Sequence, residues 1–344
     1  MTSRIALIMG FLGFIPLAAA AADPPAPGKD AHHYNRLLGR GINLGNALEA
    51  PSEGEWGLTL KAEFFEKIRR AGFDSVRIPV RWATHTGPAP DFAVDPEFFR
   101  RVDWAVDQGL AQGLVVVVNA HHDDALYKKP TEQLPRLRAT WKQVAARYRD
   151  RPDRLYFEPL NEPQGELTDG RWQAMFGTLL ATIRESNPRR PVIVGPGHWN
   201  NLEHLGSLEL PEGDRLLIAT FHYYNPFHFT HQSADWVEGS KAWAGTTWAG
   251  TPPQREALRR DFEKAAAWAK KHDRPLYLGE FGAYSAADME SRAAWTAAVA
   301  REAERLGISW SYWEFASGFG AFDKDAGTWR GPLLGALIPP GGRP

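Results

Sequence analysis

The chain of 344 residues contains no cysteine and carries a formal net charge of −1. The absence of cysteine excludes a disulfide framework and thiolate metal ligands. The near-neutral charge gives no electrostatic basis for binding nucleic acid or an anionic membrane surface. A chain of this length does not need disulfides, because it can bury a core large enough to stabilise itself. We therefore expect a globular protein whose partner is neither a nucleic acid nor a membrane.

The N-terminal segment, residues 1–22, has the composition of a secretory signal. Arg4 precedes the apolar stretch Ile5–Leu17, and the small residues Ala18–Ala22 follow, as in a cleavable signal peptide. A membrane anchor is the alternative, but a span needs about 20 unbroken apolar residues. Pro16 interrupts this stretch. We therefore predict a cleaved signal and a secreted or periplasmic mature protein with no membrane contact.

The remainder of the chain indicates a single domain. Residues 23–34 are rich in proline and alanine, which predicts a flexible lead. Residues 35–344 contain no linker, repeat or low-complexity break. Eight short apolar runs are the candidate strands: Gly41–Leu44, Ser75–Val80, Leu114–Asn119, Leu155–Leu160, Pro191–Val194, Leu216–Phe221, Leu276–Gly279 and Ile308–Tyr312. Amphipathic stretches with helical spacing lie between them: Lys61–Arg70, Pro96–Gln112, Leu134–Arg149, Arg171–Ser186, Arg255–Lys271 and Asp288–Arg305.

This alternation of strands and helices predicts the fold class. Strands that are apolar on both faces and alternate with helices indicate a parallel sheet covered on both sides. Eight such units fit a (β/α)8 barrel better than an open sheet. No glycine fingerprint of a dinucleotide-binding fold follows the first strand. We therefore predict an α/β protein with one (β/α)8 TIM barrel.

Two glutamates stand at the ends of predicted strands. Glu162 closes the run Leu155–Pro163, and Glu280 closes the run Pro275–Gly282. In a (β/α)8 barrel the reactive groups lie at the carboxyl ends of the strands. Two carboxylates delivered to that rim are what hydrolysis of a glycosidic bond requires. Glycoside hydrolysis is therefore the leading interpretation.

Other polar side chains follow the same strands. They are Asn43, Asn46 and Glu49 after the first strand, Arg77 in the second, His121 and His122 after the third, His222 and Tyr224 after the sixth, and Trp313 after the eighth. Glu158 lies about 13 Å below Glu162 along its strand and is predicted to be a buried acid paired with an arginine. Asn161 and Glu162 can both serve the site only if the strand breaks there, as Pro163 allows.

The histidines leave a metal centre open as an alternative. His121, His122 and His222 could bind zinc, because imidazoles at the strand ends of barrels do so. Metal-dependent hydrolases of this fold would need further His or Asp ligands from the first strand, and the segment Asn43–Asn46 supplies none. We therefore predict neither a metal nor another cofactor.

The chain resembles glycoside hydrolase family 5, the (β/α)8 retaining glycosidases that include endoglucanases and mannanases. The resemblance extends from about Arg40 to Phe315 and rests on seven motifs in the same order. They are Gly-Ile-Asn-Leu-Gly-Asn46-Ala-Leu-Glu49, Ser-Val-Arg77-Ile-Pro, Asn-Ala-His121-His122, Asn161-Glu162-Pro, Phe-His222-Tyr-Tyr224, Gly-Glu280-Phe-Gly and Trp310-Ser-Tyr-Trp313. The segment Phe221–Trp236 is similar to that of single-domain endoglucanases, some of which also cleave mannan.

The resemblance implies a role for each matched residue. Glu162 would be the acid/base and Glu280 the nucleophile. Asn161 would bind the 2-hydroxyl of the sugar, and Trp313 would stack on the sugar at the cleaved bond. The other implied sugar-binding residues are His121, His122 and His222 at the cleaved bond, and Asn46, Glu49, His231 and Trp236 at neighbouring units.

Electrostatics agrees with that division of roles. A retaining enzyme needs two carboxyl groups about 5 Å apart, one ionised and one protonated. Arg77 near Glu280 would lower the pKa of the nucleophile. The resulting negative charge would raise the pKa of Glu162, and Tyr224 could donate a hydrogen bond to Glu280.

Fourteen tryptophans are a strong excess and suggest a groove floored with aromatic rings, which stack on the apolar faces of sugars. The candidates on the active rim are Trp56, Trp82, Trp199, Trp243 and Trp248. Five others lie in predicted helices and are expected to pack against the barrel: Trp104, Trp141, Trp172, Trp268 and Trp295.

Together these patterns predict a secreted retaining endo-β-1,4-glucanase, acting as a monomer on β-glucan or β-mannan chains. A β-mannanase and an exo-acting β-glycosidase of the same family remain alternatives, as does a barrel that binds glycans without cleaving them. The presence of both Glu162 and Glu280 disfavours the last alternative.

Overall fold

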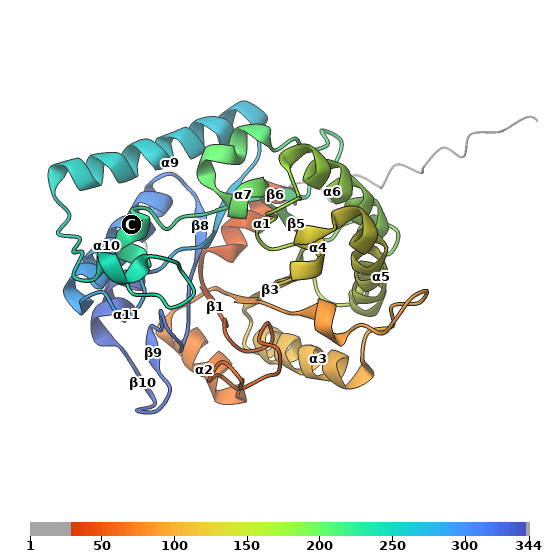
Figure 1. Cartoon of the computed structure of the whole chain (residues 1–344), viewed down its shortest axis with the longest axis horizontal. Coiled ribbons are helices and arrows are strands. Elements are labelled where there is room, and N and C mark those ends of the chain that lie inside the picture. The colour runs from red at the N-terminus through yellow and green to blue at the C-terminus, as the bar shows by residue number, and fades with distance from the viewer. Residues whose placement is uncertain (1–28, 342–344) are drawn as a thin grey trace, which may run out of the picture.

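The strands form the closed parallel barrel that the sequence predicts. The computed structural model describes residues 29–341, in which eight strands pair in chain order and the eighth returns to the first (Figure 1). They are β1 (Arg40–Asn43), β2 (Ser75–Ile78), β3 (Val115–Asn119), β4 (Leu155–Glu158), β5 (Val192–Val194), β6 (Leu217–His222), β7 (Leu276–Glu280) and β8 (Ser309–Tyr312). The predicted signal peptide and residues 23–28 of the predicted lead lie outside the described residues.

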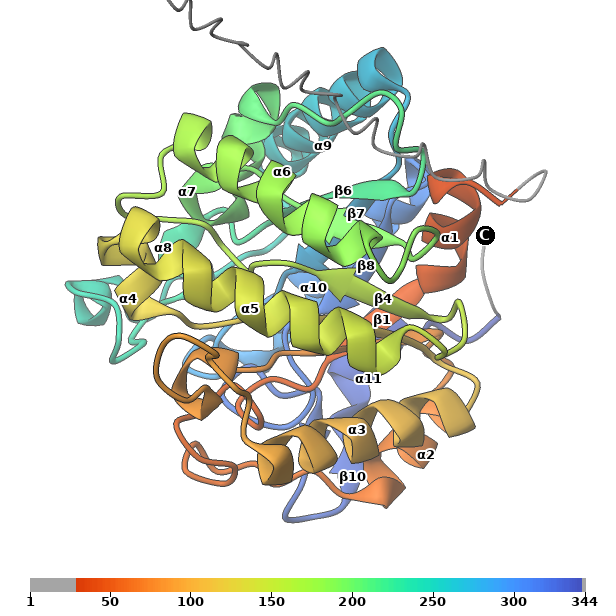
Figure 2. The ribbon, with the colours of Figure 1, turned by 90° about the vertical axis from the view of Figure 1, so that its right-hand side faces the viewer.

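Helices surround the barrel, and Figure 2 shows three of them, α3, α5 and α6, lying across one side. The long helices are α2 (Ala62–Ala71), α3 (Pro96–Ala111), α5 (Pro130–Tyr148), α6 (Asp169–Arg184), α9 (Pro252–His272) and α10 (Met289–Arg305). Shorter elements are α1 (Ala31–Leu38), η1 (Trp82–His85), α4 (Asp124–Lys128), α7 (Gly197–Asn200), η2 (Leu202–Ser207), α8 (Phe227–Thr230), η3 (Ser240–Trp243), α11 (Gly331–Leu337), and the pair β9 (Phe322–Asp323) and β10 (Thr328–Trp329). Within residues 29–341, no helix is long and apolar enough to span a bilayer.

Alternating side chains divide the core into two hydrophobic layers. Val116 and Val118 on β3 belong to the large cluster between the strands and the helices. Val115 and Val117 on the same strand belong to a separate cluster inside the barrel, because successive strand residues point to opposite faces. The strands are therefore apolar on both faces, as a barrel inside a helical shell requires.

The first helix corrects the predicted start of the domain, because residues 31–34 of the predicted flexible lead are helical. Asp30 caps α1 by accepting a hydrogen bond from the backbone N–H of His33, and Tyr34 and Leu38 join the cluster inside the barrel. The Ser75 hydroxyl, at the start of β2, donates to the carbonyl of Leu38 at 2.7 Å. The helix therefore closes the end of the barrel where the strands begin.

Two departures from regular strand geometry shape the opposite end. β4 ends at Glu158, and Glu162 adopts a left-handed backbone conformation with φ of 43°. This turn is the break that the sequence required for Asn161 and Glu162 to face one site. The register between β6 and β7 also shifts, so that His222 lies opposite Glu280. Both irregularities bring polar side chains toward the barrel axis.

Candidate active site

A fully buried arginine organises the polar end of the barrel. Arg77 donates to both carboxylate oxygens of Glu158, at 2.6 and 2.9 Å. Its terminal nitrogens also donate to Glu280 Oε1 at 2.7 Å, Asn161 Oδ1 at 2.7 Å and Asn43 Oδ1 at 2.9 Å. The prediction that Glu158 is a buried acid paired with an arginine is confirmed. Arg77 therefore joins β1, β2, β4 and β7 beneath the site.

Glu280 is held at both of its carboxylate oxygens. Arg77 donates to Oε1, and the Tyr224 hydroxyl donates to Oε2 at 2.9 Å. The side chain is only 6% exposed. The predicted contacts of Glu280 with Arg77 and Tyr224 are both present. A carboxylate fixed at both oxygens has one orientation toward the barrel axis, which suits a nucleophile.

Glu162 and Glu280 lie on either side of His222. The His222 Nδ1 atom is 2.7 Å from Glu162 Oε1 and 3.6 Å from Glu280 Oε2, and donor atoms of all three residues lie within 4.8 Å of one another. Retaining glycosidases place their carboxyl groups about 5 Å apart, and inverting ones about 6.5–9.5 Å apart. This geometry is therefore that of a retaining pair.

Burial raises the pKa of both carboxyl groups, Glu162 and Glu280. It raises the pKa of Glu162 to about 7, with the Glu158 carboxylate adding to the rise and Arg77 opposing it. Burial also raises the pKa of Glu280, against the opposing effects of His222, Arg77 and the Tyr224 hydroxyl. Arg77 acts on the pKa of Glu280 in the expected downward direction, but the expected net lowering is corrected because desolvation is larger. The main cause of the rise at Glu162 is likewise burial and not the charge of Glu280.

An asparagine from α7, the short helix after β5, completes the contacts of His222, and it was not predicted from the sequence. Burial lowers the pKa of His222 to about 4, so the ring is neutral near pH 7 and carries one N–H proton. Asn200, fully buried in α7, places its amide nitrogen 3.3 Å from His222 Nε2. An amide donating to Nε2 leaves the proton on Nδ1, which then donates to Glu162 Oε1. In our sequence analysis no polar residue was assigned to the end of the fifth strand, so Asn200 was not among the predicted site residues.

The third and eighth strand ends bring aromatic rings to the same rim. The rings of His121 and Trp313 are parallel, with centroids 5.6 Å apart, and His122 contacts Trp56 edge to face at 5.6 Å. A Cβ atom at Gly45 would lie 2.8 Å from the Trp313 ring, so glycine lets that ring lie against the β1 loop. The structure therefore brings His121, His122 and Trp313 together beside the carboxylates.

Two predicted sugar-binding residues lie in the loop after β1. Glu49 is fully buried and accepts hydrogen bonds from the backbone N–H groups of Asn46 and Ala47. Burial raises the pKa of Glu49 to about 8. Asn46, with φ of 65°, is half-buried. The structure gives Glu49 a role in shaping the loop, and its contact with a sugar stays a prediction.

Aromatic residues after β6 form a second part of the rim. His231 stacks on Phe227 with centroids 4.1 Å apart and contacts Tyr224 edge to face at 4.9 Å. Trp236 is 60% exposed and contacts Tyr284 at 5.0 Å. Trp236 therefore offers an open indole face near the carboxylates, while His231 is buried behind it.

The expectations for the other tryptophans are partly corrected. Trp199 is 53% exposed and Trp56 39% exposed, as expected for rim residues. Trp82 and Trp248 are each only 2% exposed and present no face to a glycan. Trp82 packs on Phe98 and Phe99 of α3, because the short helix η1 turns its ring inward. The helical tryptophans pack against the core as predicted.

Donor atoms suitable for a cation occur at the catalytic cluster itself. Glu162, His222 and Glu280 each present one such atom. However, both ring nitrogens of His222 already have partners, and the Arg77 cation lies 2.7 Å from Glu280. This donor set therefore fits hydrogen bonding better than metal binding. A second cluster of possible metal ligands consists of Asp169, His198 and His204. It does not include Glu162, His222 or Glu280.

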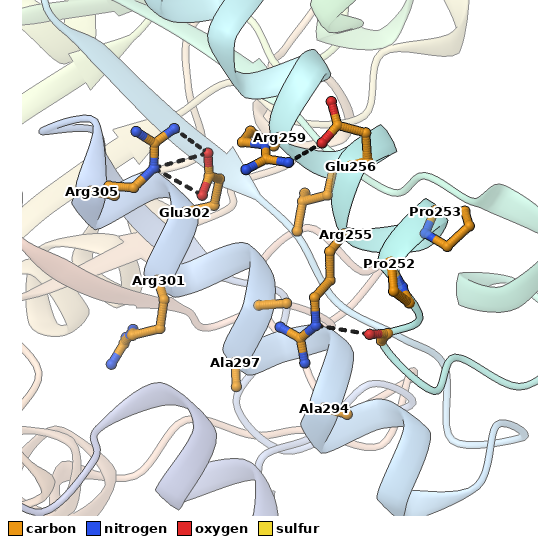
Figure 3. A pocket seen from close by; sticks show the side chains of 13 residues that line it. Pro252, Pro253, Arg255, Glu256, Arg259, Ala294, Ala297, Arg301, Glu302 and Arg305 are labelled. Carbon is orange, nitrogen blue, oxygen red and sulfur yellow. Dashed lines mark hydrogen bonds and ion pairs between the residues drawn. The ribbon is translucent and has the colours of Figure 1, made fainter.

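A cavity lies away from the carboxylates, between α9 and α10 (Figure 3). Its volume is about 1050 Å³, and it is floored by Ala294, Ala297 and Ala298. Its charged groups have partners, since Arg305 pairs with Glu302 at 2.6 Å. No residue of the candidate site lines this cavity, so the cavity is not part of that site.

Comparisons with known proteins agree with this geometry. The family model described as Cellulase (glycosyl hydrolase family 5) matches residues 40–318. Endoglucanase H of Acetivibrio thermocellus is 36% identical over 322 residues, which cover 92% of this chain and 34% of that protein. The chain therefore spans about a third of the length of Endoglucanase H.

Solved structures of similar length match along nearly their whole chains. Thermotoga maritima Cel5A in complex with cellobiose is 48% identical, with a TM-score of 0.89 over 90% of this chain and 100% of that one. The same protein in complex with mannotriose is 47% identical, with a TM-score of 0.88 over 90% and 100%. The family match includes all eight barrel strands and both carboxylates, and the chain therefore belongs to the cellulase family, glycosyl hydrolase family 5.

Proposed function

We propose that this chain is a retaining endo-β-1,4-glucanase that cleaves β-glucan chains by double displacement. The observation that carries the proposal is the pair Glu162 and Glu280. A carboxylate oxygen of one lies within 4.8 Å of a carboxylate oxygen of the other, and the two groups have different hydrogen-bond partners. Glu280 accepts hydrogen bonds from Arg77 and from the Tyr224 hydroxyl. Glu162 has a pKa of about 7, which favours its protonated form as the acid.

In the first step Glu280 attacks the anomeric carbon, and the bond from that carbon to the glycosidic oxygen breaks. Glu162 gives its proton to the departing oxygen, so the leaving chain departs as a neutral alcohol. Because the His222 Nδ1–H group binds Glu162 Oε1, the acidic proton is directed to Oε2. The product is a glycosyl ester on Glu280 and an ionised Glu162.

In the second step water replaces Glu280 at the anomeric carbon. Ionised Glu162 removes a proton from that water, and the ester bond breaks to restore the Glu280 carboxylate. Arg77 and Tyr224 stabilise the charge that returns to Glu280. Asn161 accepts from Arg77 through Oδ1, and its side chain also hydrogen-bonds Glu162, which lowers the pKa of that carboxyl group. The second amide N–H of Asn161 is left for the 2-hydroxyl of the sugar. Two inversions at one carbon give net retention.

We expect Glu162→Gln to reduce kcat/KM by about 10²–10⁴-fold on substrates with poor leaving groups. Activated aryl glycosides should suffer far less in their first step, because they need no proton from the enzyme. In the wild type, kcat/KM should fall as the pH rises above about 7, since Glu162 then loses its proton. Initial rates on cellotetraose and on a dinitrophenyl cellobioside, from pH 4 to 9, measure both effects.

The alkaline fall should disappear in Glu162→Gln, because the amide does not titrate. Glu256→Ala, which changes a glutamate in the cavity between α9 and α10, is the matched control and should keep the wild-type pH profile. Equal losses on the two substrates, or an unchanged alkaline fall, would remove Glu162 from the acid role.

A second substrate class, β-mannan, is supported by one comparison. Thermotoga maritima Cel5A, which is 47% identical to this chain, has been solved with mannotriose. Mannose differs from glucose in an axial 2-hydroxyl, and Asn161 is the residue predicted to meet that group. Its oxygen is held by Arg77 and its side chain also hydrogen-bonds Glu162, so the second amide N–H is the group that would meet the 2-hydroxyl.

A panel of polysaccharides tests the proposal. We expect initial rates to be highest on carboxymethylcellulose and mixed-linkage barley glucan, with lower rates on glucomannan and galactomannan and none on xylan. The first products should be short oligosaccharides of mixed length, because an open groove binds internal bonds. Glu280→Ala serves as the inactive control.

Other outcomes would replace parts of the proposal. Glucose released singly from the first minutes would indicate an exo-acting β-glycosidase. Cleavage confined to mannans would keep the mechanism and change the substrate. Quenching of tryptophan fluorescence by glucan without new reducing ends would indicate a binding protein only.

A further inference from the structure

Three side chains that the catalytic mechanism does not use converge on one point of the same rim. Asp169, His198 and His204 each present one donor atom, and these atoms lie within 4.8 Å of one another. Asp169 Oδ2 is 3.4 Å from His204 Nδ1 and 4.0 Å from His198 Nε2. Asp169 opens α6, His198 belongs to α7 and His204 to η2, so the cluster joins three elements that follow β4 and β5.

The backbone that carries His198 is held in an unfavourable conformation. His198, Trp199 and Asn200 have φ angles of 53°, 60° and 53°, and side chains with a Cβ atom rarely occupy this left-handed region. The result is that the His198 ring stacks on His204, with centroids 3.8 Å apart. Both rings therefore present a nitrogen to the same carboxylate. Such strain persists where surrounding contacts enforce it, and it concentrates at functional sites.

Asp169 lacks a partner on its second oxygen. Its Oδ1 atom is buried and has no hydrogen-bond partner among residues 29–341. A Cβ atom at position 197 would lie 2.4 Å from this oxygen, so Gly197 is what allows the carboxylate to approach the α7 backbone. A buried carboxylate oxygen without a donor is costly. A cation bound at the neighbouring Oδ2, which faces both histidines, would reduce that cost by neutralising the carboxylate.

We propose that Asp169, His198 and His204 bind a divalent transition-metal cation of the zinc class. Two imidazoles and one carboxylate are ligands that zinc accepts, with a water molecule in the fourth position. Zinc–nitrogen bonds of 2.0–2.1 Å give tetrahedral donors separated by about 3.3 Å, close to the 3.4 Å between Asp169 and His204. The two rings are stacked at 20° to each other and must rotate to aim a nitrogen of each at one cation, as their exposures of 49% and 37% allow.

The position of this site gives the cation a structural role beside the acid/base. The N–H group of Trp199 donates to the carbonyl of Pro163, the neighbour of Glu162, at 3.1 Å. Asn200 contacts His222, which in turn contacts Glu162. A cation on His198 would hold this left-handed segment in place. It would take no part in bond cleavage, so the proposal stands apart from the glucanase function.

Calorimetry with the full mature chain tests the proposal. Tag-free protein, stripped with a chelator, is titrated with zinc chloride, and its melting temperature is measured with and without the metal. We expect one equivalent of zinc per chain and a higher melting temperature, because a ligand that binds only the native state stabilises it. Asp169→Asn, His198→Gln and His204→Gln should each weaken zinc binding by at least about 10-fold and remove the thermal shift.

Two controls separate this site from others. His272→Gln changes a histidine that stacks on Trp268 in α9 and should bind zinc like the wild type. Glu280→Ala dismantles the catalytic cluster and should also keep its equivalent of zinc. Binding that survives Asp169→Asn and His204→Gln but is lost in Glu280→Ala would overturn the proposal. So would the absence of binding at millimolar zinc, which would leave Asp169 as an ion-pair partner of the two histidines.

Discussion

Glu280→Ala should lower kcat on β-glucan by on the order of 10⁴-fold or more, as loss of a nucleophile does. The reason is that the first step needs a carboxylate at the anomeric carbon, and water held by the remaining residues is a poor replacement. The fold should survive, because Arg77 keeps both of its hydrogen bonds to Glu158. Reducing-end assays and circular dichroism on the purified variant measure the two effects.

Added azide or formate should restore activity in Glu280→Ala. A small anion can enter the space left by the side chain and attack the same face of the sugar, which yields a product of inverted configuration. Proton NMR of the reaction with an aryl β-cellobioside identifies that product. Tyr224→Phe removes only one hydrogen bond to Glu280 and should cost much less activity. If Glu280→Ala retains more than a few per cent of the rate, another residue is the nucleophile.

Arg77→Ala should have the largest effect on stability, about 3–5 kcal/mol, as expected when one partner of a buried ion pair is removed. The variant leaves Glu158 and Glu280 buried without their shared cation and frees Asn161. Activity should disappear as well. Arg77→Lys keeps a charge but not the planar group that reaches several acceptors, so it should recover part of the stability and little activity. Urea unfolding followed by tryptophan fluorescence measures these differences.

The loss caused by Arg77→Ala should depend on pH in a defined direction. Removal of the cation raises the folded-state pKa of Glu280 further, because Arg77 opposes the rise that burial causes. A group whose pKa is higher in the folded state loses its stabilising contribution as the pH rises, so the variant should be weakest at high pH and closest to wild type at low pH. Arg147→Ala breaks an exposed pair with Asp103 and should cost no more than about 1 kcal/mol. Equal losses in the two variants would contradict the central role given to Arg77.

The barrel and the positions of Glu162 and Glu280 at its rim were predictable because their signals are local in the sequence. An apolar run such as Val115–Val118 is buried on both faces, and a polar residue at the end of such a run reaches the rim by topology alone. Glu162 and Glu280 follow this rule, whereas Arg77 lies within β2. The break before Glu162 was also predictable, since Pro163 and the strand period together required it.

The remaining features depend on contacts that are distant in the sequence. Asn200 reaches His222 only because three successive residues adopt a left-handed backbone conformation. The residue types at those positions do not predict this conformation. Trp82 and Trp248 follow strands like the exposed tryptophans, but neighbouring helices cover them. Glu49 follows β1, as a sugar-binding residue would, but its carboxylate accepts a hydrogen bond from the backbone of its own loop. The eight residues of α1 are too few to show a clear period.

The helix α1 sets the orientation of the enzyme relative to anything fused upstream of it. The chain enters at the end of the barrel where the strands begin, and Ala31 is fastened there by a hydrogen bond to the carbonyl of Arg215. The catalytic pair faces the opposite end. A carrier, bead or neighbouring module attached ahead of Lys29 would therefore sit behind the barrel, and the cleft would point outward to long, bulky polymers. Attachment through the N-terminus should thus preserve access in immobilised forms of the protein.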